Sequence, residues 1–159
     1  MPGPSGEGRM QFQPLEVLLV EDDPDDVELT LHTLERERIT NSVQVVRDGE
    51  EALDYIFCRG PYAERGSANP RLILLDLKLP KVDGLQVLRE IKADPRTRSI
   101  PVVILTSSKE EKDLIAGYEM GVNSYIQKPV DFSQFQRTIR EAGFYWLLVN
   151  QPLPSGQTR

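Results

Sequence analysis

Residues 72–79 read LILLDLKL, and this stretch indicates how the chain folds. Its four leading apolar residues predict a strand covered on both faces, because a strand with one wet face alternates apolar and polar residues. Asp76 follows directly, and an ionised carboxylate costs much free energy to remove from water. We therefore expect the strand to end before Asp76, with this side chain outside the core.

Similar apolar runs recur along the chain and are separated by helical patterns. After the first run, Val27, Leu31 and Leu34 recur at helical spacing, and further helical patterns follow the other runs. Strands that alternate with helices predict an α/β fold, a doubly wound five-stranded parallel sheet with right-handed crossovers. The predicted strands are 15–20 (LEVLLV), 43–46 (VQVV), 72–75 (LILL), 102–105 (VVIL) and 124–127 (SYIQ).

Capping residues mark the starts of the predicted helices. Asp23 can cap a helix whose first turn holds Pro24. We interpret Asp25 and Asp26 in the same way, because acids near a helix N-terminus favour its dipole. The remaining predicted capping pairs are Asp48 with Glu51, Ser108 with Glu111, and Asp131 with Gln134.

Length and composition favour one globular domain. The 159 residues suffice for a single core, which we place at 15–150, between disordered tails at 1–14 and 151–159 that are rich in Pro, Gly and polar residues. A net charge of −6 argues against nucleic acid as a partner, and no apolar run approaches the ~20 residues of a membrane span. The lone Cys58 cannot form an internal disulfide, which fits a cytoplasmic protein.

Acidic residues follow two strands that should be neighbours in the sheet. In the flavodoxin-like strand order 2-1-3-4-5, ligands bind beyond the carboxyl ends of the strands, between the first and the third. Glu21 and Asp22 follow the first strand, and Asp76 follows the third. Three neighbouring carboxylates repel one another and need a proton or a cation. An all-oxygen site suits Mg²⁺ better than zinc, so the sequence predicts a magnesium site.

Two further strand ends supply groups for phosphate chemistry. Beside a metal ion, the Asp76 carboxylate can attack a phosphoryl group and form an acyl phosphate. Thr106 follows the fourth strand and can donate a hydrogen bond to a phosphoryl oxygen, and Lys128 follows the fifth and can bring an ammonium group. Each residue alone is commonplace, but the ordered set is specific.

Four segments carry these residues: LLVEDDP, LLDLKLPKVDG, PVVILTSS and NSYIQKPVDF. With them the chain, from Leu15 to Asn150, resembles a response-regulator receiver domain of two-component signalling, the family that includes CheY. LDYIFCRGPY and the ending FYWLLVN resemble, more narrowly, the single-domain regulators that partner bacterial phytochromes and related sensor kinases. The resemblance implies no enzymatic activity beyond self-phosphorylation and self-dephosphorylation.

The resemblance also implies how the acidic site works. Asp76 would accept a phosphoryl group from a sensor histidine kinase in a Mg²⁺-dependent reaction. Asp22 would bind Mg²⁺ directly and Glu21 through water, and the main-chain carbonyl of Lys78 would complete the protein ligands. Two residues depart from the common pattern. Glu21 stands where many members have Asp, and Lys78 adds a cation where many have a neutral residue, which we expect to alter the lifetime of the acyl phosphate.

The same resemblance makes Thr106 and Tyr125 a switch pair and predicts a cis bond between Lys128 and Pro129. Phosphorylation would then change the surface formed by the fourth helix, fifth strand and fifth helix, which signals to an unknown downstream protein. Each residue also has a plainer interpretation. Tyr125 could be strand packing, Thr106 a helix-flanking hydroxyl and Lys128 a solvated lysine. His32, the only histidine, lies off the apolar helix face and is expected to be solvated.

Two other functions fit this fold and predict different sequences. A Mg²⁺-dependent phosphohydrolase with an aspartyl nucleophile would need a second acid just beyond Asp76, where this chain has Lys78. A flavodoxin-like cofactor binder would need a Ser/Thr/Gly-rich phosphate loop after the first strand, and the acidic EDDPDD would repel such a ligand.

The end of the last predicted helix holds more apolar residues than one helix face can bury. Its core side comprises Phe135, Ile139, Ala142 and Trp146. A surplus of exposed apolar side chains indicates an interface, so we predict a symmetric homodimer built on this helix. Closure over the domain's own core is the alternative. The predicted interface residues are Phe144, Tyr145, Leu147, Leu148 and Val149.

Overall fold

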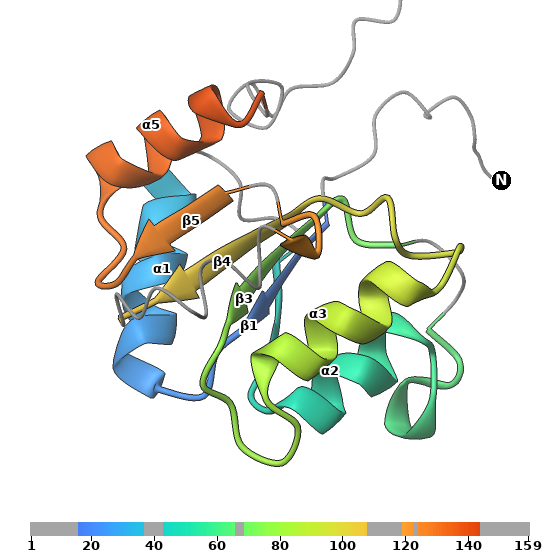
Figure 1. Cartoon of the computed structure of the whole chain (residues 1–159). Helices are drawn as coiled ribbons and strands as arrows, with labels where there is room; N and C mark the ends of the chain where they lie inside the picture. Colours follow the sequence, from blue (N-terminus) through green and yellow to red (C-terminus); the bar gives the residue numbers. More distant parts are fainter. Residues whose placement is uncertain (1–15, 37–42, 66–68, 108–118, 123, 144–159) are drawn as a thin grey trace, which may run out of the picture.

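The computed structural model describes residues 16–36, 43–65, 69–107, 119–122 and 124–143. These residues form a five-stranded sheet in the order β2-β1-β3-β4-β5, in which every neighbouring pair is parallel (Figure 1). The predicted fold class and strand order are therefore confirmed. The strands are β1 (Val17–Val20), β2 (Val43–Val46), β3 (Leu72–Asp76), β4 (Val102–Thr106) and β5 (Ser124–Gln127).

The apolar runs form strands because both faces of the sheet are covered. All residues of β1, β3 and β4 are buried, whereas β2 and β5 lie at the edges and are partly exposed. A strand buried on both faces needs apolar side chains at consecutive positions. The burial of the three central strands thus explains the continuous runs that identified them.

Among the residues that the structure describes, four α-helices pack on the two faces of the sheet. The helices are α1 (Pro24–Arg36), α2 (Gly49–Ile56), α3 (Gly84–Ala93) and α5 (Phe132–Glu141). Helices α1 and α5 lie on one face of the sheet, and α2 and α3 lie on the other (Figure 1). Side chains of α1 and α5 join one buried apolar cluster, and those of α2 and α3 join the other. The helix predicted after Ser108, the tails and the predicted interface after Gly143 lie outside the described residues.

The predicted caps are present at three of these helices. The Asp48 side chain accepts a hydrogen bond from the amide of Glu51 at 2.7 Å, and Asp131 accepts one from Gln134 at 2.7 Å. Asp23 accepts one from the amide of Asp25 at 2.8 Å. Each bond satisfies an amide that has no partner within its helix. Sequence inspection missed Asp83, which caps α3 in the same way.

The segment after α2 is packed against that helix rather than extended from it. It contains a short 3-10 helix, η2 (Gly60–Tyr62). The rings of Tyr55 and Tyr62 meet edge to face with centroids 5.0 Å apart, and the Tyr62 hydroxyl donates to Glu51 at 2.7 Å. Arg65 donates to the main-chain oxygen of Tyr55 at 2.8 Å. The described part of this segment is thus an ordered extension of α2.

Two strands run one residue further than predicted. β3 includes Asp76 and β4 includes Thr106, and both side chains are buried. The expectation that Asp76 lies outside the core was wrong, because Lys128 supplies a compensating charge within the protein. A buried carboxylate is tolerated when it is paired in this way.

None of the described helices is long and apolar enough to cross a bilayer.

Candidate functional site

Three carboxylates meet at the carboxyl edge of the sheet, between β1 and β3. Val20 of β1 and Leu75 of β3 are register partners, so the residues that follow them enter the same space. Glu21, Asp22 and Asp76 each offer a carboxylate oxygen, and these oxygens lie within 4.8 Å of one another. The structure thus brings together the three acids that the strand order predicted to converge.

Glu21 is held in place by the backbone around it. Its amide donates to the main-chain oxygen of Val46 on β2 at 3.0 Å, which continues the pairing of the strands. Its carboxylate accepts a hydrogen bond from the amide of Asp23 at 3.1 Å. Glu21 is fully buried, whereas Asp22 is exposed. The site therefore has one closed side and one side open to solvent.

Lys128 is the positive centre of the site. Its Nζ lies 2.9 Å from Glu21 Oε1, 3.2 Å from Asp76 Oδ2 and 3.0 Å from Asp26 Oδ2. The amide of Lys128 donates to the main-chain oxygen of Thr106 at 2.9 Å. The peptide bond between Lys128 and Pro129 is cis. A single ammonium group thus joins the ends of three elements and the loop after β5.

Burial and pairing shift the pKa values of the two innermost charged groups. The pKa of the Glu21 carboxyl is raised to about 7, chiefly by burial and in part by the neighbouring Asp76, and hydrogen bonding to Lys128 opposes this shift. Burial lowers the pKa of Lys128, but hydrogen bonds to Glu21 and Asp26 outweigh it and raise the pKa above its ordinary value. Lys128 is therefore a permanent cation within this site.

Asp26 is the site residue that sequence inspection did not find. It lies in the first turn of α1, where we interpreted it as an acid that favours the helix dipole. The side chain in fact forms an ion pair with Lys128. A signal was available in the helical spacing, because Asp26 lies one residue before the buried Val27 and so near the edge of the packed face.

Thr106 and Tyr125 lie on the side of the site formed by β4 and β5. Thr106 is the last residue of β4 and is buried, and it pairs in register with Gln127 of β5. Tyr125 is half-buried and packs against the apolar cluster beneath α2 and α3. His32 is exposed on α1, as expected.

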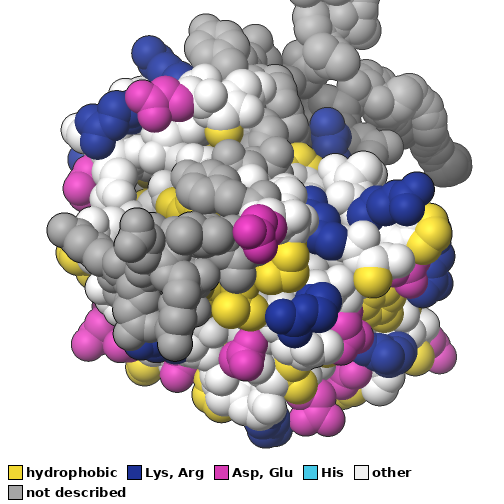
Figure 2. Space-filling view, in the orientation of Figure 1, with side chains coloured by type: hydrophobic (Ala, Val, Ile, Leu, Met, Phe, Trp, Pro, Cys, Tyr) yellow, Lys and Arg dark blue, Asp and Glu magenta, His cyan; other side chains and the backbone are white. Residues whose placement is uncertain are grey.

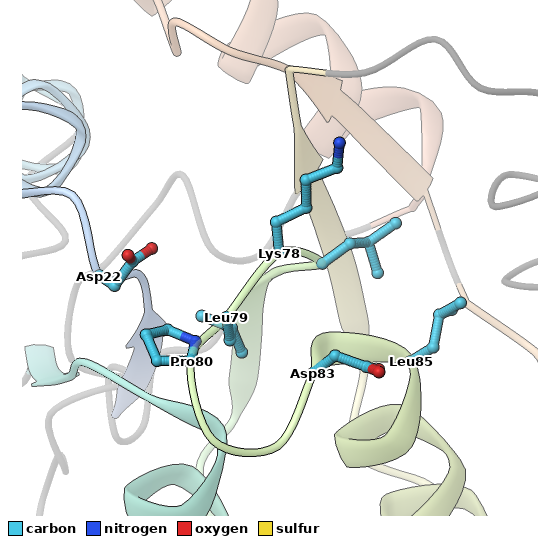
Figure 3. Close-up of a pocket in the computed structure, with 7 residues that line it drawn as sticks. Asp22, Lys78, Leu79, Pro80, Asp83 and Leu85 are labelled. Atoms are coloured by element: carbon cyan, nitrogen blue, oxygen red, sulfur yellow. The ribbon is translucent and has the colours of Figure 1, made fainter.

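The loop between β3 and α3 forms one wall of an open pocket beside Asp22 (Figure 3). Lys78 follows Asp76 by two residues, and its amide donates to Asp76 Oδ1 at 3.3 Å. Figure 3 shows the Lys78 side chain extending away from Pro80 and Asp83, which line the other side of the pocket. The pocket therefore opens to solvent beside Asp22, the exposed member of the acidic cluster.

Two glycines allow this loop to pack closely on α2 and α3. The Gly84 amide donates to the main-chain oxygen of Leu77 at 2.8 Å, and a Cβ on Gly84 would lie 2.3 Å from the main-chain oxygen of Asp76. A Cβ on Gly49 would lie 1.8 Å from the main-chain oxygen of Val82. Only a residue without a side chain fits at either position.

The donor set of the acidic cluster fits a hard divalent cation. It consists of carboxylate oxygens, one of them exposed, which are the ligands that Mg²⁺, Mn²⁺ and Ca²⁺ accept. Zinc would favour nitrogen or sulfur ligands. The residues present are therefore able to hold a metal of the magnesium type.

The surface in Figure 2 carries charges of both signs, interspersed. Basic side chains do not gather into a continuous patch among the described residues drawn there. This face gives no special attraction for a phosphate backbone.

Curated relatives match the chain over most of its length. The probable methanogenesis regulatory protein FilR2 of Methanothrix harundinacea is 43% identical over 147 residues, which is 92% of this chain and 93% of that protein. Response regulator Rcp1 of Synechocystis is 40% identical over 134 residues, or 84% of this chain and 90% of that protein.

Solved structures share the fold at similar identity. The bacteriophytochrome response regulator RtBRR has a TM-score of 0.79 and 52% identity, covering 89% of this chain and 86% of its own. The phosphorylated cyanobacterial phytochrome response regulator RcpA has a TM-score of 0.73 and 40% identity, covering 90% and 100%. An Mn²⁺-bound form of Rcp1 has a TM-score of 0.72 and 39% identity, covering 87% and 99%.

The response regulator receiver domain family matches residues 17–140, which include every residue of the site. Receivers bind a divalent metal and work with a histidine kinase. Membership of this family does not by itself indicate a catalytic enzyme activity. The match in sequence, strand order and metal-type site leads to one conclusion: this chain belongs to the response regulator receiver family of two-component signalling.

Proposed function

We propose that Asp76 accepts a phosphoryl group from the histidine of a sensor kinase, in a Mg²⁺-dependent reaction. One observation carries this proposal: Asp76 Oδ2 lies 3.2 Å from the Lys128 ammonium, beside two further carboxylates that fit a divalent cation. A carboxylate placed so can act as a nucleophile, because cations on both sides offset the charge of an incoming phosphoryl group.

The chain's own residues would perform the transfer. A carboxylate oxygen of Asp76 forms the new bond to phosphorus, and the bond from phosphorus to the kinase imidazole nitrogen breaks with its electron pair left on that nitrogen. Asp22 and Glu21 would hold Mg²⁺, with the main-chain carbonyl of Lys78. When bound, Mg²⁺ offsets negative charge on the phosphoryl oxygens. The only catalysis in this proposal is self-phosphorylation and self-dephosphorylation, in which water later cleaves the acyl phosphate.

The signal would leave through the surface that includes β5 and α5. Thr106 would turn toward the phosphoryl group, and Tyr125 would then move inward. Two observations support these roles. The buried Thr106 is linked through its main-chain oxygen to Lys128, and Tyr125 is half-buried beside the core. A change of charge at Asp76 would thereby bias a two-state element, which a downstream protein reads.

The proposal is tested by incubating the purified chain with a small phosphodonor and Mg²⁺. Intact mass should increase by one phosphoryl group per chain, and fragment masses should locate that group at Asp76. Chelation before the donor is added should prevent the gain. A gain of mass that persists in the chelated sample, or that maps to another residue, would contradict the proposed chemistry.

A phytochrome or a related sensor kinase is the partner that we propose. RtBRR and RcpA are named as response regulators of phytochromes, and RtBRR is 52% identical to this chain. The matched regions also cover 90% of Rcp1 and 93% of FilR2. This supports a role as a single-domain regulator, whose receiver domain comprises residues 15–150. A cytoplasmic location fits the single cysteine.

We further propose a homodimer through the residues that follow α5. The core face of α5 is already filled by Phe135 and Ile139, both fully buried. The sequence beyond Gly143 adds the five large apolar residues of the predicted interface, and a second copy would bury their side chains. Light scattering at micromolar concentration should give twice the mass of one chain, and Leu148→Lys should halve it. A strictly monomeric protein, with or without the phosphoryl group, would end this proposal.

A further inference from the structure

Lys128 has three carboxylate partners, and they belong to two different groups. Glu21 and Asp76 are members of the acidic cluster that fits a divalent cation. Asp26 is not a member, although its carboxylate lies 3.0 Å from Lys128 Nζ. The ammonium group thus stands between the metal-type cluster and a separate acid on α1.

Lys128 and a divalent cation would compete for the same two carboxylates. A cation between Glu21, Asp22 and Asp76 draws electron density from the oxygens that now accept hydrogen bonds from Nζ. The Lys128 side chain is only 9% exposed, so water cannot readily hydrate its ammonium group in place of the carboxylates. A buried cation that loses its partners is costly. Another acceptor within reach would lower that cost.

We propose that Asp26 is a positioning residue, which holds the Lys128 ammonium at the edge of the site when Glu21 and Asp76 bind a divalent cation. This inference rests on the proposed metal and phosphoryl function and adds a residue to it. Asp26 then serves both states of the site. It shares Lys128 with the acidic cluster before the cation arrives and becomes the principal partner afterwards.

The position of Asp26 suits this role. The first turn of α1 fixes the residue, since its amide lies 3.4 Å from Asp23 Oδ1 within the cap of the helix. The side chain is 23% exposed, so it is part of the site rim rather than of the core. Asp25 is the natural control, because it is an exposed acid in the same turn and has no ion pair among the described residues.

Asp26→Asn should weaken the affinity for a divalent cation by about fivefold more than Asp25→Asn does, which is the order expected for the net contribution of one hydrogen bond. Both variants remove one negative charge near the site, so the difference reports the contact with Lys128. Asp26→Glu keeps the carboxylate and should recover most of the affinity. Asn is a good residue near a helix N-terminus, so neither variant should unfold the protein.

The measurement is a titration of each variant with Mn²⁺ alone, in which the electron paramagnetic resonance signal reports the concentration of the free ion. It is made at one fixed pH for all variants. A thermal melt in chelator verifies that each variant is folded. The proposal would be overturned if Asp26→Asn bound Mn²⁺ with the same affinity as Asp25→Asn, or more tightly than the unmodified chain does.

A double-mutant cycle with Lys128→Met separates the ion pair from the general loss of charge. If Asp26 acts through Lys128, then in the Lys128→Met background Asp26→Asn should reduce the affinity for Mn²⁺ no more than Asp25→Asn does. Additive effects would overturn the proposal. These outcomes are independent of phosphorylation: if Asp76 takes up no phosphoryl group the proposed function fails, while the cation titration still decides the role of Asp26.

Discussion

Asp76→Asn should remain folded and should take up no phosphoryl group, where the unmodified chain takes up one. The amide is too weak a nucleophile to form the acyl phosphate. The substitution keeps the shape of the side chain and an oxygen that can accept the Lys78 amide. It leaves Lys128 with two carboxylate partners, Glu21 and Asp26, so the buried ammonium remains paired.

The measurement is intact mass after incubation with phosphodonor and Mg²⁺. Asp83→Asn is the matched control, since it removes a carboxylate that lines the pocket beside Asp22 and keeps a good capping residue for α3. The control should gain one phosphoryl group as the unmodified chain does. Normal uptake by Asp76→Asn would place the reaction at another residue.

Gly84→Ala should lower the free energy of unfolding by about 3 kcal/mol, a typical cost of overpacking. The new methyl group would lie 2.3 Å from the main-chain oxygen of Asp76 and 2.5 Å from the Cα of Leu77. Both neighbours are backbone, so no side chain can turn aside to make room. The loop that follows Asp76 must therefore move, and phosphorylation should slow as well.

Chemical denaturation measures the loss, and Gly143→Ala provides the comparison. Among the described residues, no atom lies within 4 Å of a Cβ added at Gly143, but the φ of Gly143 is +83°. Its substitution should cost only the backbone strain, about 1 kcal/mol. If Gly84→Ala costs no more than Gly143→Ala, the loop is less tightly held than its contacts indicate.

The fold was predictable because topology and burial act on many residues at once. Continuous apolar runs mark β1, β3 and β4, whose residues are all buried, and the alternation with helices leaves few possible arrangements. The exact residues at which the strands end were harder to predict from the sequence. β3 includes Asp76 because a lysine more than fifty residues later compensates its charge, and no local pattern carries that information.

The acidic site followed from the strand order alone, since the carboxyl ends of neighbouring parallel strands share one edge. Asp26 did not follow, because an acid in the first turn of a helix already has a sufficient local explanation. That explanation was incomplete rather than wrong. The contact with Lys128 joins residues about one hundred positions apart, and it forms because α1 packs on the same face of the sheet as α5, near the loop after β5.

The ion pairs of Lys128 also have a consequence for how the domain responds as a whole. This one group is bonded to residues of α1, of the loop after β1 and of β3, while its own backbone belongs to the loop after β5. A change at any partner therefore alters the balance of forces on all four segments together. Such shared dependence favours a concerted transition, in which intermediate conformations have little population.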